Sequence, residues 1–255
     1  MKQMRLFVMA LGAVMAVGTM SVPAVQAADV SYGADVGMVS KYIWRGVTQS
    51  TGSAVQGDVS AAYGGLTASA WFSNSYTGVN GFPVVEADWT LDYSGSYDKV
   101  GYEVGGLYYT YLNDSGSNFP EVYAALSYDA LIVPSIKVSY TPADSNSKYY
   151  KQGDTWIDLG LSTVLPGGVS LAGTVSFAYW KKKTTGISPR VPDEWKKGVQ
   201  LVTLSMSKDY SVSGLTVTPS LTGTIPVVKK SLDGNKYIYG AQVEPEVVVG
   251  ANISF

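Results

Sequence analysis

The chain has 255 residues with a near-even balance of 18 basic and 20 acidic side chains, and it contains neither cysteine nor histidine. The absence of cysteine excludes disulfides, and the absence of histidine excludes Ser-His catalysis and removes the commonest metal ligand. The 28 Gly, 19 Tyr and 6 Trp favour β-structure, and the slight acidic excess argues against a nucleic-acid partner. We expect no cofactor and no enzyme activity.

The first 27 residues predict a Sec signal peptide. Lys2 and Arg5 form a positive start, residues 6–20 are an apolar run, and a small-residue site predicts cleavage after Ala27. We therefore expect residues 1–27 to be removed on export and residues 28–255 to form one domain.

Apolar and polar residues alternate along most of the chain after the signal. In residues 214–225, for example, Leu215, Val217 and Leu221 fall on one face and Thr on the other. A period of two residues predicts β-strands. About twelve are expected, at roughly 34–46, 53–63, 65–74, 83–94, 98–111, 120–129, 131–141, 152–165, 168–181, 197–209, 213–226 and 239–255, although dividing the longest segments differently would give ten or fourteen.

Short and long connections alternate between these strands. Gly64 and Gly65 form one short connection, and residues 166–168 form another. Residues 75–82 and 181–196 form long connections. The first connection, between residues 46 and 53, is the shortest of the long set. This alternation is typical of an antiparallel outer-membrane β-barrel with short periplasmic turns and both termini in the periplasm. Because hydrocarbon cannot satisfy an open strand edge, the barrel must be closed.

The alternation also assigns the two faces. The apolar set faces outer-membrane lipid, with these aromatic residues expected at the membrane interfaces: Tyr42, Trp44, Tyr93, Tyr108 and Tyr179. The opposite set lines the predicted pore: Lys41, Arg45, Asp58, Glu86, Asp88, Asp92, Glu103, Lys137, Asp158 and Glu246, with Asp154 and Glu244 in the same phase. Reversing the phase would place Lys or Arg in lipid at about 2–4 kcal/mol each.

The acidic excess of this inner face predicts a cation-preferring pore for passive diffusion of small hydrophilic solutes or ions. The alternative is a structural or surface-interaction barrel whose charges form salt bridges and which does not conduct. For Lys41 and Arg45 we expect ion pairs with Glu86 or Asp88 near the external rim, with Gly46 bending the strand into its loop. Glu86 and Asp88 also resemble a catalytic acid pair, but the sequence shows no accompanying cleft.

Two further features suggest partners. Trp180 and a basic loop form a second cluster, with Lys181, Lys182, Lys183, Arg190, Lys196 and Lys197. This loop could gather anionic solutes or contact lipopolysaccharide phosphates, although we favour the simpler explanation of a solvated charged loop. The last strand ends on Phe255, which predicts the terminal signal read by the barrel assembly machinery. A soluble exported β-sandwich would end on such a strand as well.

Three N-terminal stretches share their residue order with a known family. These are residues 34–50 (ADVGMVSKYIWRGVTQS), 54–74 (AVQGDVSAAYGGLTASAWFSN) and 85–93 (VEADWTLDY). The matching residues are Tyr42, Trp44, Arg45, Gly46, Thr48, Gln49, Ser50, Gln56, Gly57, Trp71, Glu86, Asp88 and Tyr93. They resemble the TorF family of Gram-negative outer-membrane proteins, which are regarded as porins. The resemblance covers about the first third of the exported chain and implies an outer-membrane pore, but it carries no substrate and no functional residues.

Overall fold

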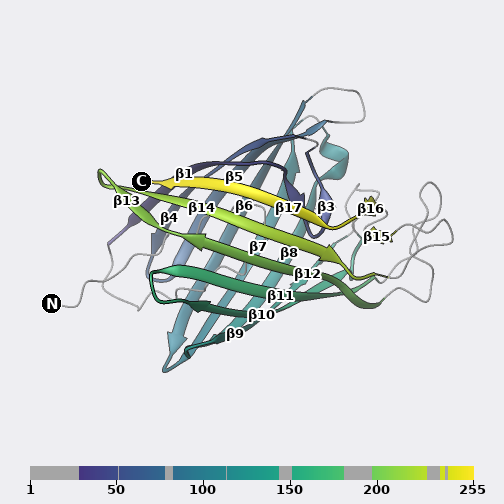
Figure 1. Ribbon diagram of the computed structural model, residues 1–255. Helices are drawn as coiled ribbons and strands as arrows, with labels where there is room; N and C mark the ends of the chain where they lie inside the picture. Colours follow the sequence, from purple (N-terminus) through teal and green to yellow (C-terminus); the bar gives the residue numbers. More distant parts are fainter. Residues whose placement is uncertain are drawn as a thin grey trace.

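The computed structural model describes residues 29–50, 52–77, 83–112, 114–143, 151–180, 197–228, 236–238 and 241–255. Twelve antiparallel strands form a closed barrel (Figure 1), which confirms the predicted fold class. They are β1 (Ser31–Val39), β4 (Ala54–Tyr63), β5 (Leu66–Thr77), β6 (Pro83–Tyr97), β7 (Val100–Tyr111), β8 (Phe119–Tyr128), β9 (Val133–Tyr140), β10 (Thr155–Val164), β11 (Val169–Tyr179), β12 (Lys197–Lys208), β14 (Leu215–Pro226) and β17 (Glu246–Ser254).

Each strand pairs with its neighbours along the chain, and β1 closes the barrel by pairing with β17, with Asp35 opposite Ser254 and Val39 opposite Gly250. Five short strands and one 3-10 turn lie in the connections: β2 (Ile43–Trp44), β3 (Val47–Thr48), β13 (Tyr210–Val212), β15 (Lys236–Ile238), β16 (Ala241–Val243) and η1 (Ser115–Ser117). Among the described residues, no helix is long and apolar enough to cross a membrane.

Burial follows the two-residue period that the sequence predicts. In β8, Phe119, Glu121, Tyr123 and Ala125 are buried, whereas the intervening Val122, Ala124, Leu126 and Tyr128 are exposed. Successive side chains of a strand point to opposite faces of a sheet, so the first set lies inside the barrel and the second set covers its outside. The outside is consequently apolar and the inside is mixed aromatic, acidic and hydroxyl-bearing.

The two ends of the barrel differ in the length of their connections. At one end lie short turns such as Gly64–Gly65, together with the start of β1 and the end of β17; β13 and the C-terminus mark this end on the left of Figure 1. At the other end lie the longer connections, including the β15–β16 hairpin, on the right of Figure 1. The predicted alternation of short and long connections is confirmed in the described residues.

Two predicted segments are wrong in detail. Residues 34–46 are not one strand, because β1 ends at Val39 and residues 40–50 leave the wall. This link was expected to be the shortest of its set, yet it is long enough to contain the paired β2 and β3. Residues 239–255 are likewise divided, into β16 and β17.

Candidate functional site

The connection between β1 and β4 folds into the barrel as a hairpin. We call residues 41–50 the plug hairpin. Ile43 pairs with Thr48 and Trp44 with Val47, leaving Arg45 and Gly46 as a two-residue turn with φ angles of 46° and 80°. Two successive positive φ angles are those of a type I′ turn, whose twist matches that of paired strands. The Arg-Gly sequence is therefore the tip of the hairpin rather than the end of a membrane strand.

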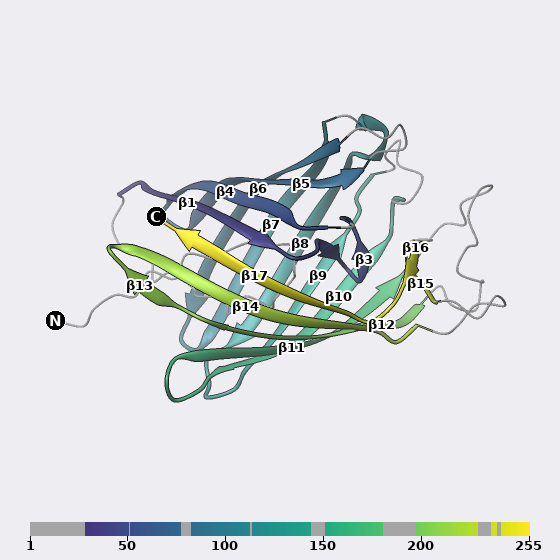
Figure 2. The same ribbon diagram turned by 45° about the horizontal axis from the view of Figure 1, so that its top comes forward.

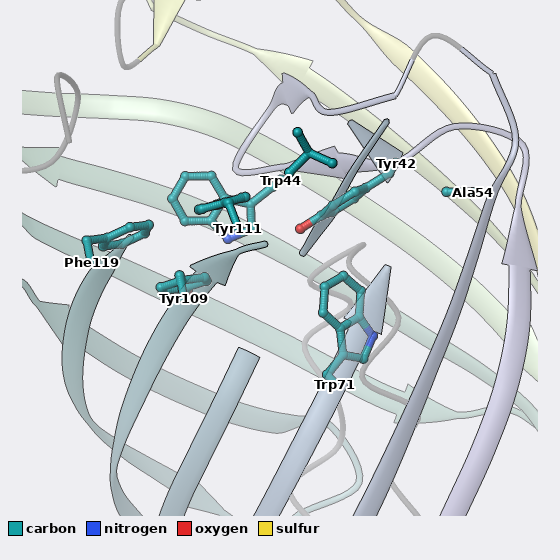
Figure 3. Close-up of a cluster of buried hydrophobic side chains, with 8 residues drawn as sticks. Tyr42, Trp44, Ala54, Trp71, Tyr109, Tyr111 and Phe119 are labelled. Atoms are coloured by element: carbon teal, nitrogen blue, oxygen red, sulfur yellow. The ribbon is translucent and has the colours of Figure 1, made fainter. Parts of the chain in front are cut away.

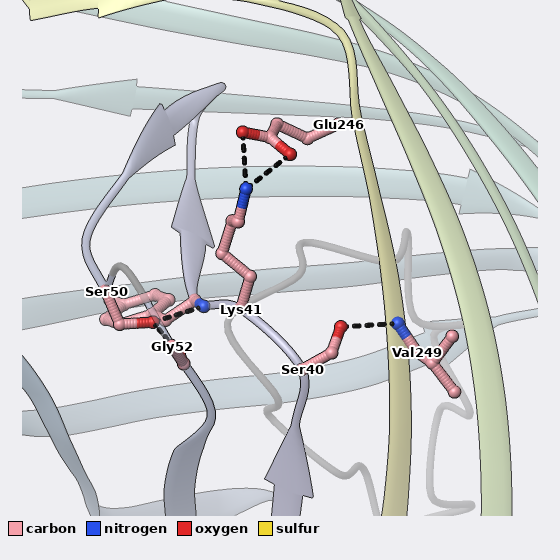
Figure 4. A network of polar contacts seen from close by, with 7 residues as sticks. Ser40, Lys41, Ser50, Gly52, Glu246 and Val249 are labelled. Atoms are coloured by element: carbon pink, nitrogen blue, oxygen red, sulfur yellow. Dashed lines mark hydrogen bonds and ion pairs between the residues drawn. The ribbon is translucent and has the colours of Figure 1, made fainter.

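Hydrogen bonds fix the base of the plug hairpin. The Tyr42 amide donates to the Ser50 hydroxyl oxygen over 2.7 Å, and the same hydroxyl donates to the Gly52 carbonyl, also over 2.7 Å (Figure 4). The Val249 amide donates to the Ser40 hydroxyl oxygen at 3.0 Å, which ties the chain entering the hairpin to β17. The hairpin thus leaves the wall at a defined point where the barrel closes.

Aromatic side chains hold one side of the plug hairpin against the barrel wall (Figure 3). The Tyr42 ring meets Trp71 of β5 edge-on at 5.6 Å between centroids, and the Trp44 ring meets Tyr109 of β7 at 5.7 Å. Tyr109 in turn stacks on Phe119 of β8 at 4.2 Å. The prediction that Tyr42 and Trp44 lie at the membrane interface is therefore wrong, because both are buried inside, with 1% and 7% of their surface exposed.

The hairpin's other side contacts a second apolar cluster. Val47 packs against a group that joins three strands of the wall to the β14–β17 connection, namely Trp156, Ala178, Leu201, Val228 and Val243. In Figure 2, β3 lies within the outline of the barrel close to β16, at the end with the longer connections. The plug hairpin is therefore packed on both sides.

Arg45, at the hairpin tip, is 5% exposed and makes a bidentate ion pair with Glu121 of β8. Its Nη1 donates to Glu121 Oε1 at 2.7 Å and its Nη2 to Oε2 at 2.9 Å. The guanidinium carbon also lies 4.6 Å from the Trp44 ring centre and 5.1 Å from that of Trp156. Such contacts between a cation and an aromatic ring are attractive because the ring face carries partial negative charge.

The expected partners of Arg45 and Lys41 are thus wrong, although both do form ion pairs with carboxylates. Arg45 pairs with Glu121 rather than Glu86 or Asp88, because the inward hairpin carries it across to β8. Lys41 pairs with Glu246 at 2.7 Å, beside the closing strand (Figure 4). Glu121 was missed as an inner residue, although it alternates with the outward Val122 and this phase would have identified it.

Further carboxylates lie around the plug hairpin. Asp158 accepts hydrogen bonds from the Trp156 indole at 2.8 Å and from the Ser176 hydroxyl at 2.5 Å. Glu86 accepts from the Tyr111 hydroxyl at 3.0 Å and from the Tyr42 hydroxyl. Burial, with the nearby Glu86 and Asp88 carboxyl groups, raises the pKa of Tyr42 well above its ordinary value, so that Tyr42 remains a neutral donor.

The remaining predicted site residues lie apart from the hairpin tip. Asp58 is buried on β4, directly opposite Asp35 of β1. Nearer the short-turn end, the residues Asp92, Glu103 and Lys137 are half-buried, and the Lys137 ammonium lies 3.9 Å from the centre of the Tyr123 ring. Of the two others in the same phase, Asp154 is buried and Glu244 is exposed.

The inner surface is chemically two-sided. The buried acidic residues Asp58, Glu86, Asp88, Glu121 and Asp158 belong to strands β4 to β10. Among the side chains that the structure describes, the buried polar residues of β11, β12 and β14 are uncharged and include Thr174, Ser176, Thr203, Thr222 and Thr224. Within the described ranges, no group of three or more Asp, Glu, His or Cys could hold a metal ion.

Two predicted features lie outside the residues that the structure describes: the signal peptide at residues 1–27 and the basic loop at residues 181–196. Phe255 is described and is 67% exposed, and its amide donates to the Ala34 carbonyl of β1 at 3.1 Å. This hydrogen bond completes the pairing of the last strand with the first.

The barrel is similar in fold to solved outer-membrane proteins. It matches the NanC porin with a TM-score of 0.53 and 13% sequence identity, over 88% of this chain and 99% of that chain. OmpT of Vibrio cholerae, in its trimer form, gives a TM-score of 0.40 at 9% identity, over 90% of this chain and 99% of that one. The channel DcaP of Acinetobacter baumannii gives 0.39 at 10% identity, over 89% and 97%.

At 13% identity the match to the NanC porin concerns the fold alone, and it supports a porin-like barrel. No curated protein matches the sequence significantly. The family model Gcw_chp, described as a bacterial protein of unknown function, matches residues 24–217, so the chain belongs to this family.

Proposed function

We propose that the protein is an outer-membrane channel for passive diffusion of small hydrophilic solutes or ions, with a preference for cations. The observation that carries the proposal is the contrast between the two faces of the closed barrel. Its outside carries exposed apolar residues such as Val104, Leu126 and Leu161, whereas buried carboxylates such as Asp88 and Asp158 lie inside. An apolar outer band and a polar interior are the features that a barrel needs in order to span a membrane and admit water.

The charge of the interior supports cation preference. Carboxylates inside a low-dielectric wall raise the local concentration of cations and lower that of anions. Two of the inner bases, Arg45 and Lys41, are already neutralised by Glu121 and Glu246, so they oppose this field only weakly. A twelve-strand barrel is also narrower than porins of 16–18 strands, so we expect small conductance.

Export and assembly complete the proposal. Residues 1–27 direct Sec export, Phe255 is read by the assembly machinery, and both termini lie in the periplasm. The connections at the opposite end then face the exterior, where the basic loop of residues 181–196 meets lipopolysaccharide. The N-terminal motif, which includes Tyr42 and Arg45, supports a relationship to the TorF porins.

A second candidate function is a structural barrel that does not conduct. The plug hairpin favours it, because Tyr42, Trp44 and Val47 fill interior volume and contact the wall on two sides. The two candidate functions differ in whether a continuous water-filled path through the barrel remains beside the plug hairpin. In the channel, this path runs past the buried acidic residues of strands β4 to β10.

Planar-bilayer recording of the purified protein distinguishes them. In a KCl gradient we expect small channels whose reversal potential indicates K⁺ preference. Asp88→Asn should reduce this preference because it removes a buried inner charge, whereas Asp129→Asn, which removes an exposed charge beyond β8, should leave it unchanged. Absence of conductance would support the structural barrel, and anion selectivity would contradict the proposed channel.

A further inference from the structure

The surroundings of Arg45 resemble a ligand site more than a simple ion pair. The planar guanidinium group of Arg45 is bound at one edge by both carboxylate oxygens of Glu121 and faces the rings of Trp44 and Trp156. The Tyr109 hydroxyl donates to Glu121 Oε2 at 3.1 Å and so orients the carboxylate. Fork-shaped binding to a carboxylate, combined with aromatic contact, is the geometry that suits a guanidinium group and not a spherical ion.

Most of this site belongs to the barrel wall and not to the hairpin. Glu121, Tyr109 and Trp156 project from β8, β7 and β10, whereas Arg45 enters at the tip of a connection. Their positions are fixed by strand pairing and by contacts outside the hairpin, including the Tyr109–Phe119 stack and the Trp156–Asp158 hydrogen bond. The wall side of the site is therefore preorganised without Arg45.

Acidic side chains outnumber the single arginine around this site. Asp158 lies close enough to Arg45 to interact electrostatically with it, and Asp88 lies close to both Glu86 and Glu121. All four carboxylate side chains are at least nine-tenths buried. Removal of Arg45 would leave these acids facing aromatic side chains, which is an environment that favours an organic cation.

We propose that the wall carries a binding site for the guanidinium group of a diffusing solute, and that Arg45 is the chain's own occupant of that site. This inference rests on the proposed channel function and names the solute class that the channel favours. A solute bearing a guanidinium group competes with Arg45 for Glu121 and Trp156, and binding of the solute releases the hairpin tip. Urea has the same planar shape without the charge, so it does not compete.

The test uses Arg45→Ala, whose site lacks its own cation, with guanidinium chloride at millimolar, non-denaturing concentration as the probe. Binding is followed by tryptophan fluorescence of the folded barrel in detergent, with sodium chloride and urea as matched controls. We expect saturable binding of guanidinium to Arg45→Ala, and binding about tenfold or more weaker to Arg45→Ala/Glu121→Gln, since a hydrogen bond to a charged group contributes a factor of that size. Asp129→Asn, a conservative change at an exposed position beyond β8, should leave the affinity unchanged.

The same variants in bilayers separate this inference from the channel proposal. If Arg45→Ala conducts K⁺, guanidinium should reduce its current and urea should not. If it does not conduct, the channel proposal fails while the fluorescence measurement still tests the site. Equal binding of guanidinium to Arg45→Ala and to Arg45→Ala/Glu121→Gln, or equal effects of guanidinium and urea, would overturn the inference. Should the alanine variant not fold, Arg45→Gln takes its place, with the same expected results.

Discussion

Replacement of Arg45 by Met tests the contact that holds the plug hairpin. Met is shorter than Arg but similar in volume and has no charge, so Arg45→Met keeps most of the volume while removing the two hydrogen bonds to Glu121, at 2.7 and 2.9 Å. It also removes the contacts of the cation with Trp44 and Trp156. The Glu121 carboxylate then stays buried, with the Tyr109 hydroxyl as a remaining donor.

The expected cost follows from this burial. The Arg45 and Glu121 side chains are 2% and 5% exposed, so water can do little to replace the lost partner. Breaking a buried ion pair from one side costs about 3–5 kcal/mol, because an uncompensated charge remains in a low-dielectric site. If that cost falls on docking of the hairpin alone, the ratio of docked to released hairpin falls by about a hundredfold to a few thousandfold.

The assay is a double-mutant cycle of unfolding free energies in lipid vesicles, read by tryptophan fluorescence. Its members are the wild type, Arg45→Met, Glu121→Gln and the double variant. The double variant should cost less than the sum of the single variants, because it leaves no buried charge without a partner. A cost of Arg45→Met below about 1 kcal/mol, the range of exposed ion pairs, together with additive effects would refute the reasoning.

Two further predictions concern other contacts. The side chains of the Lys41–Glu246 pair are 31% and 19% exposed, so a double-mutant cycle of Lys41→Met and Glu246→Gln should give a coupling energy of only about 0.2–1 kcal/mol. High salt should reduce this coupling energy. A salt-independent coupling of several kcal/mol would contradict the prediction. Gly65→Ala should lower the unfolding free energy by about 1–3 kcal/mol, because φ is +91° and the new Cβ would lie 2.7 Å from the Ser94 carbonyl oxygen. The matched change Gly64→Ala, with φ of +58° and open space around it, should cost less, and equal costs would show that the close approach is unimportant.

The barrel could be predicted from sequence because its signals are local. Alternation within a strand assigns a face to each residue, so the inward phase of Glu86, Asp88 and Asp158 follows from their apolar neighbours. The length of each connection assigns it to one end of the barrel. Neither signal depends on knowing which strands are opposite one another.

The plug hairpin could not be predicted by the same reasoning. Tyr42, Ile43 and Trp44 continue the appearance of a strand after Val39, and Arg45 is an unusual first residue for a turn that Asn, Asp or Gly normally occupies. Because the hairpin reverses direction inside the barrel, the face assigned by counting from β1 no longer applies to Tyr42 and Trp44.

The ion-pair partners were missed for a different reason. The two-residue alternation along a strand shows that a residue lies inside the barrel. It gives neither the position of that residue along the barrel axis nor its position around the wall, so it could not pair Arg45 with Glu121. Glu121 itself had the correct phase within β8. Only the three-dimensional path of residues 40–50 brings it to Arg45.

The central claim is that the plug hairpin narrows a cation-preferring channel. Val39 and Ala54 are directly paired, so an Asn-Gly turn can replace residues 40–53 without changing the strand register. The most direct measurement compares the single-channel conductance and reversal potential of this variant with those of the wild type in a KCl gradient. We predict a several-fold higher conductance with cation preference retained, because the inner carboxylates of the strands, including Glu121 and Glu246, all remain. Unchanged conductance in a folded barrel, or a loss of cation preference, would contradict the account.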